Sequence, residues 1–269
     1  MDEFLATPGL PLTDMRTALV VGHPGHELMV HGWLETTRPL VFVFTDGSGR
    51  SNQSRLASTT KILNQAGAKR GRIYGRLTDA AAYAAILNHE FDLFVGLARE
   101  LCEAFAAERI DYVAGDAFEG YNPTHDVCRL VINTAVTVAR RLRGHCVGNL
   151  EFSLVSQPAG CHEPPHANGI CRLLDDRAFA QKMAAANGYA ELSGEVQATL
   201  ERTSIAALRT ECLRPVGPGS GEYPCDQSPF YESYGEKQVA AGHYHRVLRY
   251  HEHIAPLAEV LSRYAEGRI

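Results

Sequence analysis

The 269-residue chain lacks the features that mark exported, membrane-spanning or nucleic-acid-binding proteins. No window approaches the roughly 20 consecutive apolar residues that a membrane-spanning helix needs. The first residues are acidic where a signal peptide would be positive, and prolines interrupt the apolar ones. Arginine and lysine form no stripe, and the net charge is −5 at pH 7, which argues against nucleic acid and anionic membranes as partners.

The chain lacks the cysteine patterns that bind metal or that form the disulfide framework of small secreted domains. The seven cysteines are an odd number, and no Cys-x-x-Cys pair occurs. In a large chain without an export signal, reduced thiols are the simplest interpretation, and they predict a cytoplasmic protein. Apolar residues at 45% and charged residues at 21% are ordinary for a globular protein with a large core.

What the chain does contain is a series of strand-like apolar runs that end abruptly in polar residues. The run at 17–21 leads into Gly-His-Pro-Gly-His-Glu, and the run at 39–44 leads into Thr-Asp-Gly. A third run, at 111–116, precedes a polar segment at 119–126. A buried strand that opens onto polar residues before a helix is how α/β proteins present chemistry at the edge of a sheet.

Helix-like patterns separate these runs, at 27–36, 54–66, 91–108 and 126–141. The alternation predicts an α/β, Rossmann-like fold: a mainly parallel sheet with helices on both faces. After residue 155 the composition shifts to a loop rich in His, Pro, Gly and Cys, then to helical stretches and a long Gly/Pro loop. We therefore expect a core over 1–155 and an extension of helices and loops over 156–269 that completes the same domain, with a lid as one role for its loops.

Three histidines come from the ends of two predicted strands. His23 and His26 are three positions apart, and His125 follows the strand at 111–116. In a parallel sheet these strand ends share one edge, so the three imidazoles are expected to lie together. Three protein ligands with an open fourth position are typical of catalytic zinc. The alternative for His23 and His26 is a pair of surface residues at the start of a helix.

These segments resemble the LmbE-like, or PIG-L, family of zinc-dependent N-deacetylases, which remove acyl groups from amino sugars. The family has a strand ending in His-Pro-Asp-Asp-Glu, a second ending near Thr-Asp-Gly, and a later His-Pro-Asp-His. This chain has His-Pro-Gly-His-Glu at 23–27, Thr-Asp-Gly at 45–47 and Asn-Pro-Thr-His at 122–125, and its 229–253 segment resembles the tail of bacterial members. The resemblance implies Zn²⁺, or another divalent metal, held by His23, His26 and His125, and a sugar-like small molecule as substrate. A homo-oligomer is a further expectation.

The departures from the family motifs concern proton transfer. Gly25 stands where the family has its general base, and Asn122 stands where a histidine polarises the substrate carbonyl. Thr124 replaces the aspartate that supports that histidine, whereas the change from aspartate to His26 keeps a metal ligand. Loss of a general base typically lowers a rate by about 10²–10⁴-fold.

Other side chains are candidates to take part in catalysis. Asp46 is the favoured base because it ends a strand at the shared edge, although a turn residue before Gly47 is an equal interpretation. Asp126 is either a helix N-terminal charge or a partner of a ligand histidine, and Glu27 is either a first-turn helix residue or part of the site. Asn122 can still donate a hydrogen bond to an oxyanion. Further candidates are Glu119 and His162.

The sequence leaves three functions open. The first is a zinc-dependent hydrolase of an N-acyl amino sugar or similar polar metabolite, with an altered base. The second is a non-catalytic homologue that binds metal or sugar, which the missing base favours. The third is a tri-histidine metalloenzyme of a different reaction type. Trp33 is expected in the core, and the histidines at 31, 89 and 145 are expected at the surface.

Overall fold

The structure, a computed structural model, describes residues 14–49, 51–144, 146–155, 169–217, 220–223 and 227–269. Its centre is a seven-stranded sheet in the order β3-β2-β1-β4-β5-β7-β6. Five strands run parallel: β1 (Thr17–Val21), β2 (Leu40–Thr45), β3 (Lys69–Leu77), β4 (Tyr112–Asp116) and β5 (Gly148–Phe152). Two antiparallel strands complete the sheet, β7 (Thr210–Pro215) beside β5 and β6 (Ile170–Leu173) beside β7.

Helices cover both faces of the sheet because alternate residues of its strands point to opposite sides. Ala18 and Val20 of β1 face one core, and Leu19 and Val21 face the other. The first core is closed by α3 (Asp79–Leu87), α4 (Phe91–Ala107), α5 (Pro123–Arg143) and α10 (Ala255–Glu266). The second is closed by α1 (His31–Thr37) and α2 (Leu56–Ala66). The predicted Rossmann-like α/β fold is confirmed.

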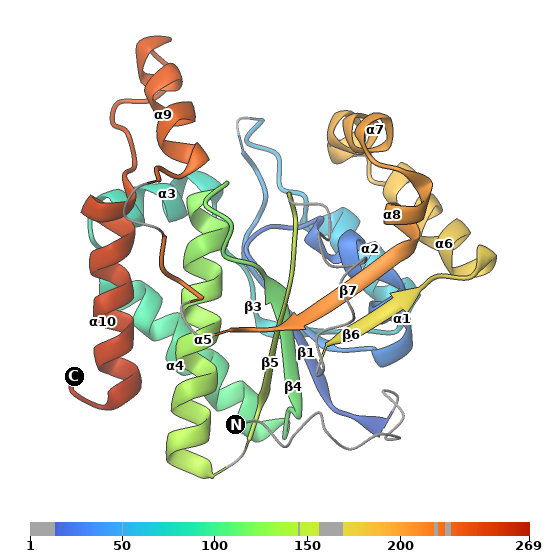
Figure 1. The fold of residues 1–269 in the computed structure, drawn as a ribbon, viewed down its shortest axis with the longest axis horizontal. Coiled ribbons are helices and arrows are strands. Elements are labelled where there is room, and N and C mark those ends of the chain that lie inside the picture. The colour runs from blue at the N-terminus through green and yellow to red at the C-terminus, as the bar shows by residue number, and fades with distance from the viewer. Residues whose placement is uncertain (1–13, 50, 145, 156–168, 218–219, 224–226) are drawn as a thin grey trace.

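The C-terminal part of the chain contributes strands as well as helices. Beyond β6 and β7, Figure 1 shows a group of helices at one side of the molecule, formed by α6 (Asp176–Asn187), η4 (Ala190–Leu192), α7 (Ser193–Arg202) and α8 (Ile205–Arg209). Helices α7 and α8 are separated because the backbone is extended at Thr203, and Ser204 caps the second helix by accepting from the Ala207 amide. On the opposite side lie α9 (Phe230–Ala240), η5 (Tyr250–Ile254) and α10.

Two expectations from the sequence are wrong. Cys171 and Cys212 form a disulfide between the paired strands β6 and β7, although all cysteines were expected to be reduced. His31 is buried rather than at the surface, because α6 of the C-terminal part packs against α1. Within the described residues, no helix is long and apolar enough to span a membrane. The cytoplasmic location stays a prediction, and His145 and His162 lie outside the described residues.

Candidate functional site

The candidate site lies where β1, β2, β3 and β4 end at one edge of the sheet. After β1 the chain turns through Gly22 and Pro24 into the short helix η3 (His26–Val30). Gly22 donates its amide hydrogen to Asp116 Oδ2 over 2.7 Å, so the turn after β1 is tied to the last residue of β4. The space beside Gly22 is small, since a Cβ there would lie 3.2 Å from the same carboxylate oxygen.

The three predicted ligand histidines are brought together at this edge. The ring centroids of His23 and His26 are 5.4 Å apart, and the ring of His125 lies 5.0 Å from the first and 4.5 Å from the second. His125 belongs to the first turn of α5, which follows β4, so the cluster joins segments far apart in the chain. The parallel arrangement of the strands is what makes these segments neighbours.

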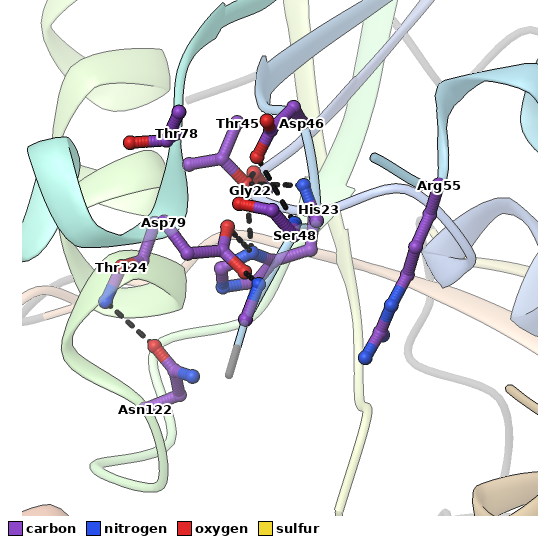
Figure 2. A network of polar contacts seen from close by, with 12 residues as sticks. Gly22, His23, Thr45, Asp46, Ser48, Arg55, Thr78, Asp79, Asn122 and Thr124 are labelled. Atoms are coloured by element: carbon purple, nitrogen blue, oxygen red, sulfur yellow. Dashed lines mark hydrogen bonds and ion pairs between the residues drawn. The ribbon is translucent and has the colours of Figure 1, made fainter. Parts of the chain in front are cut away.

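Two carboxylates, the buried Asp116 and the partly exposed Asp79, hold two of these rings. His23 Nδ1 lies 3.0 Å from Asp79 Oδ1 and 2.8 Å from Thr45 Oγ1, and His26 Nδ1 lies 2.9 Å from Asp116 Oδ1. Figure 2 shows Asp79 directed at His23 from the start of α3. Because an ionised carboxylate only accepts hydrogen bonds, this arrangement assigns the ring proton to Nδ1 and leaves Nε2 with its lone pair. Such carboxylate–histidine pairs are typical of histidines that bind metal.

The remaining nitrogen atoms make the cluster a candidate metal centre. His23 Nε2 and His125 Nδ1 are buried and have no hydrogen-bond partner. Burial, with the nearby His26 and His23, holds the pKa of His125 well below its ordinary value, so its imidazole is neutral and able to ligate. Within the described part of the chain, no group of three or more His, Cys, Asp or Glu side chains has the geometry to hold a metal ion as the side chains lie. Three imidazoles are a donor set that suits zinc chemically, and their ring centroids lie 4.5–5.4 Å from one another.

The position that corresponds to the family's general base is closed by an apolar side chain. Gly25 has φ +105°, a conformation that side chains rarely adopt, and a Cβ there would overlap Leu192 Cδ1. Leu192 ends the short helix η4 in the C-terminal part of the chain. The space on this side of residue 25 is therefore occupied by an apolar side chain.

The structure places the segment at 122–126 as a helix start. Asn122 is the N-cap of α5, and its Oδ1 accepts from the Thr124 amide over 2.8 Å. Its NH₂ group remains available as a donor, and the residue lines the cavity described below. Asp126 lies fully buried behind it and accepts from the amides of Glu119 and Gly120. Burial raises the pKa of Asp126 to about 7.

The other two predicted catalytic carboxylates are bound to nearby backbone amides. Asp46 Oδ1 accepts from the Ser48 amide over 3.0 Å, which is the geometry of a turn (Figure 2). Glu27 is fully buried, accepts from the Gly25 amide over 2.7 Å, and has a pKa raised by burial. Both contacts are structural, and the catalytic roles of Asp46 and Glu27 stay predictions.

Sequence reasoning missed the two carboxylates that contact histidines. Asp116 is the last residue of β4 and Asp79 is the first residue of α3, directly after β3. Asp116 ends the buried strand β4, a signal that would have drawn attention to it, whereas Asp79 follows the mostly polar strand β3 and has no such signal. Trp33 is 2% exposed and donates to the Tyr112 hydroxyl, which agrees with its expected place in the core.

A cavity of about 430 Å³ opens from the histidine cluster. At one end it is lined by the three histidines, Asp79 and Asn122, and at its rim by Tyr121. Its other walls come from η3, the segment after β5, η4 and the helices α6, α7 and α8. Outside the rim the ring of Tyr121 stacks on that of Phe230, with centroids 5.0 Å apart.

Comparisons with known proteins identify the fold. No protein-family model matches the chain, and no curated protein sequence does. The A40926 pseudoaglycone deacetylase Dbv21 is 16% identical over 75% of this chain and 96% of its own, with a TM-score of 0.50. The conserved protein TT1542 from Thermus thermophilus is 16% identical over 79% of this chain and 99% of its own, with a TM-score of 0.51. At the level of the fold, the resemblance to the LmbE-like/PIG-L family is confirmed.

Proposed function

We propose that the protein is a metal-dependent hydrolase that cleaves the N-acyl bond of an amino sugar or a similar polar metabolite. The observation that carries this proposal is the cluster of His23, His26 and His125 at the mouth of a cavity, with carboxylates behind two of the rings. A surface role would not require carboxylates to fix the ring protons of two histidines. The deacetylase Dbv21, which shares the fold, supports the reaction class.

The three histidines would hold the ion, and Asp79 and Asp116 would keep His23 and His26 in the ligating tautomer. When bound, zinc supplies polarisation of the substrate carbonyl and a lowered pKa for water. Asn122 would donate its side-chain NH to the carbonyl oxygen as negative charge develops there. The water oxygen would join the carbonyl carbon, the C–N bond would break, and both protons of the water would pass to the nitrogen, so that the products are a carboxylate and an ammonium group.

Proton transfer would be the slow part of this reaction. Asp79 is the carboxylate that lines the cavity at the histidine end, but its contact with His23 holds its pKa well below the ordinary value despite partial burial. A carboxylate of such low basicity accepts a proton poorly, so Asp79 acts as a positioning residue. Asp46 remains the predicted base, although Asp46 contacts Ser48 rather than His23. We expect a rate roughly 10²–10⁴-fold below that of an enzyme with a well-placed base.

The metal content of the purified protein tests the proposal. Wild type would be compared with His23→Ala and His125→Ala, and with His89→Ala as a control on an exposed histidine. We expect about one zinc ion per chain, lost in both cluster variants and kept in the control. If the wild-type protein binds no divalent metal on reconstitution, the proposal of a metal-dependent hydrolase is overturned.

A second candidate function is a non-catalytic homologue that binds the same ligand. The observation that favours it is Leu192, which fills the space beside Gly25 where the family has its base. The two candidates differ in a single-turnover assay with excess protein, where even a slow hydrolase releases amine and a binding protein releases none.

The aromatic side chains at the rim of the cavity support a substrate whose sugar ring lies outside the cavity. Tyr121 and Phe230 are 44% and 50% exposed, and their rings are nearly parallel, at 7°. Phe230 also stacks on Tyr234, with centroids 5.9 Å apart. Exposed aromatic faces offer flat apolar contact area beside polar groups, which suits a sugar ring. The cytoplasmic location and a homo-oligomer stay predictions.

A further inference from the structure

We propose that the group removed by this protein is a large apolar acyl chain, of about six carbons or more, which occupies the cavity beside the histidine cluster. This inference rests on the proposed function and names its substrate class. It starts from the part of the cavity wall away from the histidines, which is mostly apolar and has Arg55, Lys182, Glu195 and Thr199 as its polar members.

The apolar part of the wall comes mainly from the C-terminal helices. Met183 lies on α6, Leu192 ends η4, and Val196 and Leu200 lie on α7. Leu154, after β5, continues the same surface. Because Leu192 also fills the space beside Gly25, the apolar surface reaches the place where the reacting carbonyl would sit. An acyl chain whose carbonyl faced Asn122 would therefore meet apolar contacts from its first carbons onward.

The cationic side chains of this wall already have partners. Lys182 Nζ donates to the Met29 carbonyl oxygen and to Glu211 Oε1, each over 3.0 Å. Arg55 lies 3.6 Å from Glu195. Among the described residues that line the cavity, each lysine and arginine side chain is thus already paired. A phosphate or carboxylate placed in the apolar part would lose its hydration without gaining an ion pair.

The volume of the cavity is larger than an acetyl group needs. A space of about 430 Å³ lies within the range of pockets that hold drug-sized ligands, roughly 300–1,000 Å³. An acetyl group would leave most of the apolar wall in contact with water. Burial of each additional methylene strengthens binding by about fourfold, so chains that fill the space gain far more than acetyl can.

The experiment compares N-acetyl-, N-hexanoyl- and N-decanoyl-glucosamine as substrates of the metal-loaded protein. We expect kcat/KM to rise at least 100-fold from acetyl to decanoyl. Val196→Phe places a ring into the cavity and should lower the decanoyl-to-acetyl ratio at least tenfold. Gln197→Phe, one residue along the same helix but exposed and away from the cavity, is the matched control and should leave the ratio unchanged.

Binding of decanoate and acetate to the metal-free protein, measured by calorimetry, separates this inference from the proposed function. If no amide is cleaved but decanoate binds more tightly than acetate and Val196→Phe weakens it, the hydrolase fails and the chain-binding cavity stands. If amides are cleaved at rates independent of chain length, the hydrolase stands and this inference is overturned. Equal binding of acetate and decanoate would also overturn it.

Discussion

The substitution Gly25→Asp, which restores the carboxylate of the family motif, should destabilise the protein because Leu192 occupies the required space. A Cβ at residue 25 would lie closer to Leu192 Cδ1 than van der Waals contact allows. Overpacking of this kind costs about 1–3 kcal/mol. The backbone at φ +105° adds strain of about 1–2 kcal/mol for a residue with a side chain. The expected loss is therefore about 2–5 kcal/mol of unfolding free energy.

A double-mutant cycle with Leu192→Ala isolates the steric part of this loss. Truncation of Leu192 opens the space, so the overpacking cost should disappear from the double variant while the backbone strain remains. Urea denaturation of the four proteins should give a favourable coupling energy of about 1–3 kcal/mol. Effects of Gly25→Asp and Leu192→Ala that simply add would refute the contact.

The same cycle reports on catalysis. If the missing base limits the reaction, the double variant should cleave an N-acyl substrate up to about 10²–10⁴-fold faster than wild type, since an added carboxylate could accept a proton from water. Gly25→Asp alone should gain less, because Leu192 would push its side chain away from the histidines. Faster turnover in Gly25→Asp alone, at unchanged stability, would contradict this account.

Three further predictions concern charged side chains. Asp79→Ala should weaken zinc binding about 10–100-fold because it removes the carboxylate that holds His23 Nδ1, whereas Asp46→Ala should leave zinc binding unchanged. Zinc affinities are measured by competition with a chelator. Equal affinities of the two variants would count against the role of the Asp79–His23 contact. Burial raises the pKa of Asp126 to about 7, against about 3.9 when unfolded, so the unfolded chain loses this proton first. The unfolding free energy of the metal-free protein should then fall by up to about 4 kcal/mol as the pH rises from 4 to 7. Denaturation experiments on Asp126→Asn should show a weaker dependence on pH. An unchanged dependence would refute the raised pKa of Asp126. Arg129→Met removes buried hydrogen bonds to the Asp116 and Leu150 carbonyl oxygens and leaves Glu151, 3.9 Å away, with one cation fewer. It should cost about 3–5 kcal/mol, and a loss below about 1 kcal/mol by denaturation would contradict the role.

Most of the sheet and the histidine cluster follow from local patterns in the sequence. The apolar runs before Gly22 and after residue 110 are long and end abruptly, so their strands could be placed, and parallel pairing then brings His26 and His125 to one edge. No additional information was needed to expect that the three histidines would meet.

The carboxylate partners and the C-terminal strands were harder to predict. Which aspartate reaches which ring depends on register, and the pairing of β3 with β2 contains irregularities that no local pattern reveals. Strand β7 carries Glu211 and Arg214 among its apolar residues and follows a helix without a glycine or proline break, so its pattern merged with the preceding helix. The contact of Leu192 with Gly25 joins distant segments through tertiary packing alone.

The pair formed by Lys182 and Glu211 has a mechanical consequence for the cavity. Glu211 on β7 accepts from the amides of Gly32 and Trp33, while Lys182 ties α6 to the carbonyl of Met29. One buried ion pair thus joins the helical wall, the strand behind it and the segment that carries His26. Packed elements joined in this way transmit strain rather than yield. The cavity wall formed by α6 should therefore be rigid. We expect activity to fall abruptly above a certain acyl-chain length instead of declining gradually.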